Sequence, residues 1–133
     1  MSERAVDDPP ALKDISTAHF IAGAWRPMLR EVVRCFVEGD YGVTRGVAGV
    51  EPMSAAKAEG IRAYIAEYGT TLVELPEDTW QTSVAQWTGM GERWDILVDL
   101  WTAEEGRSDL VLDGWIAETD IGPRLTIHLV YVP

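Results

Sequence analysis

The residues best suited to chemistry are two aspartates and a histidine in the second half of the chain. Asp95 and Asp99 are four residues apart in a segment where polar and apolar residues alternate, so both carboxylates lie on one face of a predicted strand. His128, on the last predicted strand, can approach them if the sheet curves. Two carboxylates and an imidazole could act as acid and base if burial separates their pKa values. The better fit is an ordinary solvent-facing strand pattern, in which Asp95, Asp99 and Asp113 alternate with apolar residues.

Other kinds of catalytic or metal site find no support in the residue pattern. Cys35, the single cysteine, has no base near it in the sequence, so a half-buried structural thiol is the better fit. His19 and His128 are far apart, so no zinc-ligand spacing is present. No segment has the ligand spacing of a calcium loop, and no glycine-rich loop precedes a helix to bind phosphate. Ser83 lacks the glycines of a nucleophile elbow. We therefore expect neither a metal nor a cofactor.

Charge is unevenly distributed along the chain. The 133 residues carry a net charge of −11, and residues 74–120 hold twelve acids against Arg93 and Arg107, a net −10. Nucleic-acid binders need clustered Lys and Arg to displace counterions, which argues against that class. A one-signed surface attracts an oppositely charged protein and so indicates a basic partner, the alternative being a solvated surface that only maintains solubility. The twelve acids are Glu74, Glu77, Asp78, Glu92, Asp95, Asp99, Glu104, Glu105, Asp109, Asp113, Glu118 and Asp120.

The elements that position these residues begin with helices in the first half of the chain. A helix is predicted over residues 27–38, between Pro27 and Gly39, because apolar residues recur there at the spacing of one buried face. A second is predicted from Ser54, as N-cap, to Tyr68. Residues 15–25 have a weaker pattern that fits a shorter helix. The glycine-rich residues 40–52 fit an irregular loop or a short strand.

From residue 71 onward the apolar pattern changes to period two, which predicts strands. Glycines at 89, 91, 106 and 122 mark short turns, which favours an antiparallel meander over parallel crossovers. The fold class is therefore α+β, with two helices packed on one face of a meander of four to five strands. We expect a single domain over residues 1–133, with residues 1–14 as a flexible N-terminal segment. The predicted strands are residues 71–75, 79–87, 93–102, 109–117 and 124–132.

Four tryptophans recur every seven residues, at 80, 87, 94 and 101. Gly89 and Gly91 disfavour one continuous helix, and a hairpin with its turn at 88–93 explains the spacing better. Trp87 then pairs with Trp94 across the hairpin, and Trp80 pairs with Trp101. The two pairs lie on opposite faces of the sheet. The side with Trp87 and Trp94 is the more apolar and is predicted to be core. The other side is expected to be partly solvent-exposed. Trp80 and Trp101, ringed by acids, would either anchor a protein partner there or be covered by a helix or by the N-terminal segment.

A long tract of the second half resembles a known family. The run Trp94 to Thr102, of sequence WDILVDLWT, is followed by EEGRSDL at residues 104–110, with flanking matches at residues 71–76 and at the ending VYVP. This resembles a family of small bacterial proteins known only as a domain of unknown function, so the resemblance implies no activity. In size, acidity and α+β layout the chain is also similar to immunity proteins of bacterial toxin systems, an analogy without a diagnostic motif.

The combined pattern favours a non-enzymatic acidic binding module, of the inhibitor or immunity type, that engages a basic protein. The alternatives are a small enzyme or ligand-binding domain, with a sheet-lined pocket of Trp80, Asp95, Asp99, Trp101 and His128, and a homodimer subunit that uses the same face. No stretch of about 18 apolar residues and no signal-peptide pattern is present, so we expect no membrane span and a cytoplasmic location. The candidate binding residues are Trp80, Asp95, Asp99, Trp101, Glu105, Asp113 and His128.

Overall fold

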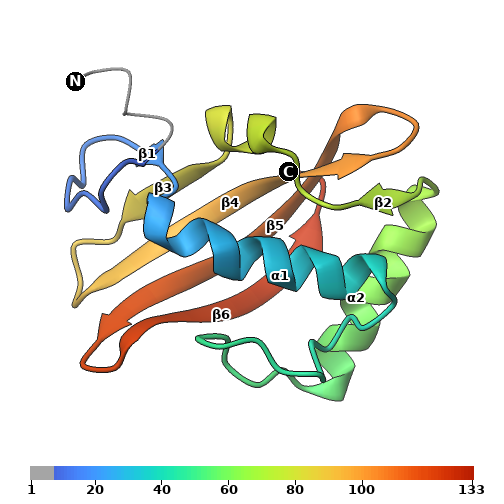
Figure 1. Ribbon diagram of the computed structural model, residues 1–133, viewed down its shortest axis with the longest axis horizontal. Helices are drawn as coiled ribbons and strands as arrows, with labels where there is room; N and C mark the ends of the chain where they lie inside the picture. The colour runs from blue at the N-terminus through green and yellow to red at the C-terminus, as the bar shows by residue number, and fades with distance from the viewer. Residues whose placement is uncertain (1–7) are drawn as a thin grey trace.

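The computed structural model describes residues 8–133, which form one sheet with two helices on one side (Figure 1). The helices are α1 (Arg26–Val37) and α2 (Ala55–Tyr68), and two short 3-10 helices are η2 (Gly23–Trp25) and η3 (Glu77–Gln81). This confirms the α+β prediction of two helices followed by an antiparallel sheet. The strands are β1 (His19–Phe20), β2 (Leu72–Val73), β3 (Val84–Trp87), β4 (Arg93–Thr102), β5 (Gly106–Thr119) and β6 (Gly122–Tyr131).

Both main helices begin and end at the residues that the sequence indicates. Pro27 occupies the first turn of α1, and Gly39 follows its end with a φ of 88°. The Ser54 hydroxyl caps α2 by accepting a 3.1 Å hydrogen bond from the amide of Lys57. Gly69 then ends α2 in the left-handed conformation, which lacks a steric cost only for glycine. The helix boundaries are therefore set locally, by caps and turn residues.

The strands are antiparallel throughout, in the order β1-β3-β4-β5-β6, and β2 pairs with the far end of β4. The predicted meander over β3 to β6 is confirmed. The segment predicted as a short helix over residues 15–25 instead contains β1 and η2, so one short strand precedes the helices. The predicted strand over 71–75 is reduced to Leu72–Val73, while β5 is longer than predicted.

Residues 8–14, the described part of the predicted flexible segment, run alongside the sheet. The indole nitrogen of Trp94 donates a 2.9 Å hydrogen bond to the carbonyl of Leu12, and the side chain of Gln86 donates to the carbonyl of Asp14. The amide of Gly23 donates to the carbonyl of Pro9 at 2.9 Å. Residues 1–7 of that segment lie outside the described residues.

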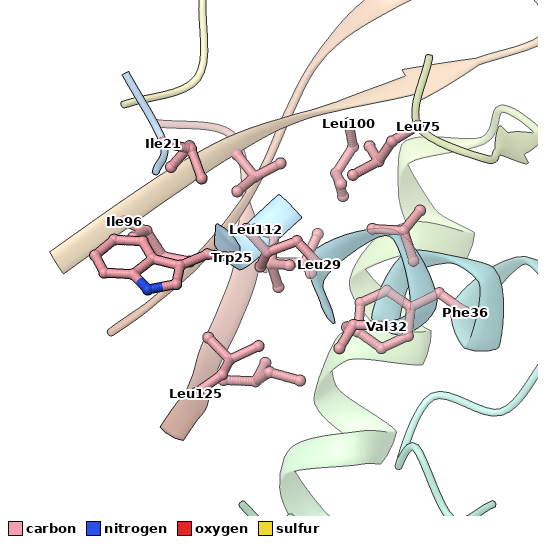
Figure 2. Close-up of a cluster of buried hydrophobic side chains, with 14 of the residues drawn as sticks. Ile21, Trp25, Leu29, Val32, Phe36, Leu75, Ile96, Leu100, Leu112 and Leu125 are labelled. Atoms are coloured by element: carbon pink, nitrogen blue, oxygen red, sulfur yellow. The ribbon is translucent and has the colours of Figure 1, made fainter. Parts of the chain in front are cut away.

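The hydrophobic core lies between the helices and the face of the sheet that they cover, called the inner face below (Figure 2). The side chains of α1 point onto the sheet, where they meet residues of β4, β5 and β6. Cys35, expected to be half-buried, is fully buried in this core, and burial raises the pKa of its thiol. The central core residues are Ile21, Trp25, Leu29, Val32, Phe36, Leu75, Ile96, Leu100, Leu112 and Leu125.

The predicted register of the central hairpin is confirmed for β3 and β4. Trp87 pairs with Trp94, and Ala85 pairs with Ile96. Trp94, Ile96 and Ala85 are buried, so this side of the hairpin is the inner face, as expected. The short turn sets this register. Burial of one face maintains it, because a slip of one residue would move every side chain to the other face.

The predicted position of Trp80 is wrong. It lies in η3, before β3 begins, and only 1% of its surface is exposed. The tighter helical period of η3 rotates the indole into the core, where the guanidinium carbons of Arg26 and Arg30 lie 5.2 and 5.7 Å from the ring centroid. Trp101 pairs instead with Val73 of β2 and with Arg107 of β5. The expected Trp80–Trp101 pair on the wet face therefore does not exist.

Candidate functional site

The side of the sheet away from α1 and α2, the outer face, carries the largest set of predicted site residues. Residues of β4 alternate between buried positions on the inner face and accessible positions on this one. Among the described residues, no helix packs on it. Its residues are Phe20, Val73, Val84, Gln86, Arg93, Asp95, Leu97, Asp99, Trp101, Arg107, Val111, Asp113, Trp115, Ala117, Arg124, Thr126, His128, Leu129 and Tyr131.

A continuous row of side chains crosses the outer face from one edge of the sheet to the other. Phe20 of β1 pairs with Val84 of β3, which pairs with Leu97 of β4. Leu97 pairs with Asp113 of β5, and Asp113 pairs with Leu129 of β6. These five residues, called the central row, are each at least partly accessible. Four are apolar, so Asp113 is the single charge in an otherwise hydrophobic stripe.

Two further carboxylates lie on either side of this row. Asp95 and Asp99 lie two residues before and two residues after Leu97, on the same face of β4. The side chain of Asp95 is 57% exposed and lies 3.6 Å from the guanidinium of Arg93. Asp99 accepts a 2.5 Å hydrogen bond from the hydroxyl of Thr82. Together with Asp113 they place three acids around one leucine.

Asp113 has the least favourable surroundings of the three acids. No Lys, Arg or His nitrogen of residues 8–133 lies within 4.0 Å of its carboxylate. Burial raises the pKa of this carboxyl group; the nearby His128 opposes the shift, and the negative charge of Asp95 adds to it. A cation placed beside Asp113 would relieve the cost of burying this charge.

Trp115 lies next to these acids and was not predicted as a site residue. It pairs with Asp95 across β4 and β5, and the guanidinium carbon of Arg93 lies 4.2 Å from its ring centroid. A register shift after Asp113 brings the His128 ring to 5.9 Å from the indole. The alternation that placed Asp113 on the wet face also places Trp115 there, so this signal was present in the sequence.

The remaining predicted residues lie at the ends of the sheet. Trp101 is half-buried at the outer-face end of β4, beside Val73. Glu105 lies in the β4–β5 turn, where its carboxylate accepts hydrogen bonds from the hydroxyls of Tyr68 (2.9 Å) and Thr102 (3.0 Å). Asp95, Asp99, Asp113 and His128 share the outer face, whereas Trp80 belongs to the core.

The model of one protein family matches residues 33–133, described as a domain of unknown function (DUF7668). The chain belongs to this family. The match includes α2 and strands β2 to β6, so it contains every residue of the outer face except Phe20. No curated protein and no solved structure shows significant similarity to the chain.

In this member of the DUF7668 family, one edge of the sheet is closed by α2 and the loop before it. The side-chain amine of Lys57 donates a 2.9 Å hydrogen bond to the carbonyl of Ile127 in β6. The hydroxyl of Tyr64 accepts a 3.2 Å hydrogen bond from the amide of Val132, just beyond β6. Leu125 forms a parallel bridge with the loop that precedes α2. These contacts occupy backbone groups that an added strand would need.

The opposite edge of the sheet is closed in a different way. Between the segments of β4 that pair with β3 and with β2, the hydroxyl of Thr79 donates a 2.7 Å hydrogen bond to the carbonyl of Asp99. The Ser83 hydroxyl accepts one of 2.9 Å from the amide of Asp99. The outermost strand, β1, has only two residues. The outer face therefore offers a partner far more surface than either edge.

The pocket expected for an enzyme does not form as predicted, because Trp80 lies on the other side of the sheet from Asp95 and Asp99.

Among residues 8–133, no three His, Cys, Asp or Glu side chains gather closely enough to hold a metal ion. No helix in the described part of the chain is long and apolar enough to span a membrane.

Proposed function

We propose that this protein is a non-catalytic binding module that holds a basic protein partner on the outer face of its sheet. The observation that carries the proposal is the central row, an accessible apolar stripe with the unpaired Asp113 inside it and Asp95 and Asp99 beside it. Apolar and aromatic side chains supply most of the binding energy of protein interfaces, while complementary charge selects the partner.

The charge of the chain supports a basic partner over a neutral one. Ten of the eleven net negative charges fall within residues 74–120, which contain β3, β4 and β5. A field of one sign accelerates the encounter with an oppositely charged protein. An inhibitor of a basic enzyme, in the manner of immunity proteins, is the form of this function that the charge favours.

The experiment that tests the proposal compares two triple variants as baits in pull-down and in binding kinetics with the captured partner. In the first variant, Asp95, Asp99 and Asp113 are replaced by asparagine. In the control, Glu38, Glu59 and Glu67 are replaced by glutamine, which changes the net charge equally on exposed positions in and beside the helices. We expect the outer-face variant to lose the partner and the control to keep it.

Salt dependence gives a second readout. Charges more than about 10 Å apart are largely screened at 0.1 M salt, so the association rate should fall steeply as salt rises, while dissociation changes less. Equal association rates for wild type and the outer-face variant at low salt would refute the proposal. Loss of an enzymatic turnover at every salt concentration in Asp95→Asn or His128→Ala would favour the pocket alternative instead. A wild-type homodimer that Leu97→Gln dissociates would favour the homodimer alternative.

A further inference from the structure

The central row has the dimensions of a binding site for a helix. Neighbouring strands lie about 4.8 Å apart, so the four steps from Phe20 to Leu129 span roughly 19 Å. An α-helix advances about 5.4 Å per turn, so a helix lying across the strands would place close to one side chain per turn over each strand. Three to four turns would cover the row from edge to edge.

The charges around the row match a basic amphipathic helix. Apolar side chains at i, i+3 or i+4, and i+7 would meet the apolar members of the row, and a Lys or Arg in that stripe would meet Asp113. Asp95 and Asp99 lie two residues to either side of Leu97, about 7 Å from the line of the row. Lys and Arg side chains that flank the apolar stripe of a helix would reach these carboxylates while their aliphatic stems cover apolar surface.

The row ends in a hollow that can receive a larger side chain. Beside β6, between this strand and α2, lies a depression of about 380 Å³ lined mostly by apolar atoms. Gly60 lines this depression and has no side chain, and no other atom lies within 4 Å of the position that a Cβ would occupy. Leu129, the last member of the row, lines this hollow with Tyr64 and Tyr131. An apolar side chain on the final turn of a bound helix would fit there.

Other occupants fit the outer face less well. An added strand would need a free sheet edge, and Lys57, Tyr64 and Thr79 already bond to the edge groups of β6 and β4. A second copy of the chain would bring another net charge of −11 against the same three acids. We infer that the outer face binds a basic amphipathic helix of the partner, lying across the strands along the central row. This inference rests on the proposed function, since it specifies the partner of the same face.

The test is a selection of random 20-residue peptides displayed on phage, against the full-length protein. The Asp95, Asp99 and Asp113 triple asparagine variant is present in solution as a competitor, so that only peptides that need the acids are retained. The expected peptides carry Lys or Arg with apolar residues at i, i+3 or i+4, and i+7, and gain helical circular dichroism when they bind. Their affinity should fall about tenfold or more with Asp113→Asn or Leu97→Gln and stay unchanged with Glu67→Gln. Urea midpoints confirm that each variant is folded.

The outcomes distinguish a failure of the helix inference from a failure of the proposed function. Retained peptides that are basic but lack helical periodicity, or that bind without gaining helix, would overturn the helix inference and leave the proposed function intact. If no retained peptide distinguishes the wild type from the triple variant, both the helix inference and the proposed function fail. Helical peptides that are insensitive to Leu97→Gln and Asp113→Asn would also overturn the inference, because they would bind elsewhere.

Discussion

The side-chain amine of Lys57 lies 2.9 Å from the carbonyl oxygen of Ile127, so a residue of α2 caps the exposed edge of β6. This hydrogen bond has a charged donor and a partly buried acceptor. It joins the helical layer to the sheet at the strand where pairing with another molecule would otherwise begin.

Replacing Lys57 by methionine keeps the aliphatic stem and removes the donor. We expect a loss of about 1–3 kcal/mol in the free energy of unfolding, because the carbonyl of Ile127 loses its partner. The uncapped edge should also increase self-association on gel filtration. Arg62→Met is the matched control, since its ion pair with Glu59 is exposed on the same helix. Equal urea midpoints for the two variants would contradict the capping role.

Trp80→Ala should be among the most destabilising single substitutions in the chain. The side chain is 1% exposed and packs beside Arg26 and Arg30, so its removal leaves a large cavity and should cost about 3–5 kcal/mol. Trp115→Ala, on the accessible outer face, should cost much less stability and instead weaken partner binding. Urea denaturation of both variants checks this contrast. Similar losses would mean that the outer face is covered in the folded protein.

The contrast between these tryptophans marks how far the sequence could predict the fold. Trp87 opposite Trp94 follows from the turn between them, because a short hairpin fixes its own register. Trp80 could not be placed in the same way. Its segment continues the alternating pattern, yet Pro76 and the acids after it begin a 3-10 turn whose period differs from that of a strand. The burial of Trp80 depends on Arg26 and Arg30, which lie far away in the sequence.

Gly114→Ala should disrupt the pairing of β5 with β6. A Cβ at this position would lie 2.4 Å from the backbone oxygen of Thr126, and a neighbouring strand cannot yield as a flexible side chain can. We expect a loss of about 1–3 kcal/mol. Gly60→Ala is the control with the opposite sign, because nothing lies near the added methyl group and alanine favours a helix by about 0.5–1 kcal/mol. Thermal unfolding measures both, and a neutral Gly114→Ala would contradict the close approach of the strands.

The central row could not be predicted from the sequence, because it depends on how five strands are aligned with one another. The sequence placed Asp95, Asp99 and Asp113 on the wet side, since alternation alone decides the face of a strand. Alignment across five strands needs the register of every ladder, and two of these ladders contain shifts, after Asp99 and after Asp113. Bulges of this kind leave no reliable signal in composition, so the juxtaposition of Asp113 with Leu97 and Leu129 appears only in the structure.

Asp113→Asn should make the protein more stable at neutral pH and a weaker binder. In the folded protein, burial first and Asp95 next raise the pKa of this carboxyl group above its ordinary value of 3.8, against the opposing effect of His128. A raised carboxyl pKa means that the folded state binds the proton more tightly than the unfolded chain does. The free energy of unfolding therefore falls as the pH rises from the ordinary pKa of 3.8 to the raised pKa of the folded state. Above that raised pKa the charged carboxylate destabilises the folded protein.

The amide variant escapes that penalty, so its urea midpoint should exceed that of the wild type near pH 7. The difference should shrink as the pH falls below 3.8, where the wild-type carboxyl group becomes neutral in both states. Asp95→Asn is the control, because its side chain is 57% exposed and should show a smaller gain. An acid that lowers stability where it stands is expected at a functional position rather than a structural one. A variant that is less stable than the wild type at neutral pH would show that the Asp113 carboxylate contributes to the fold itself.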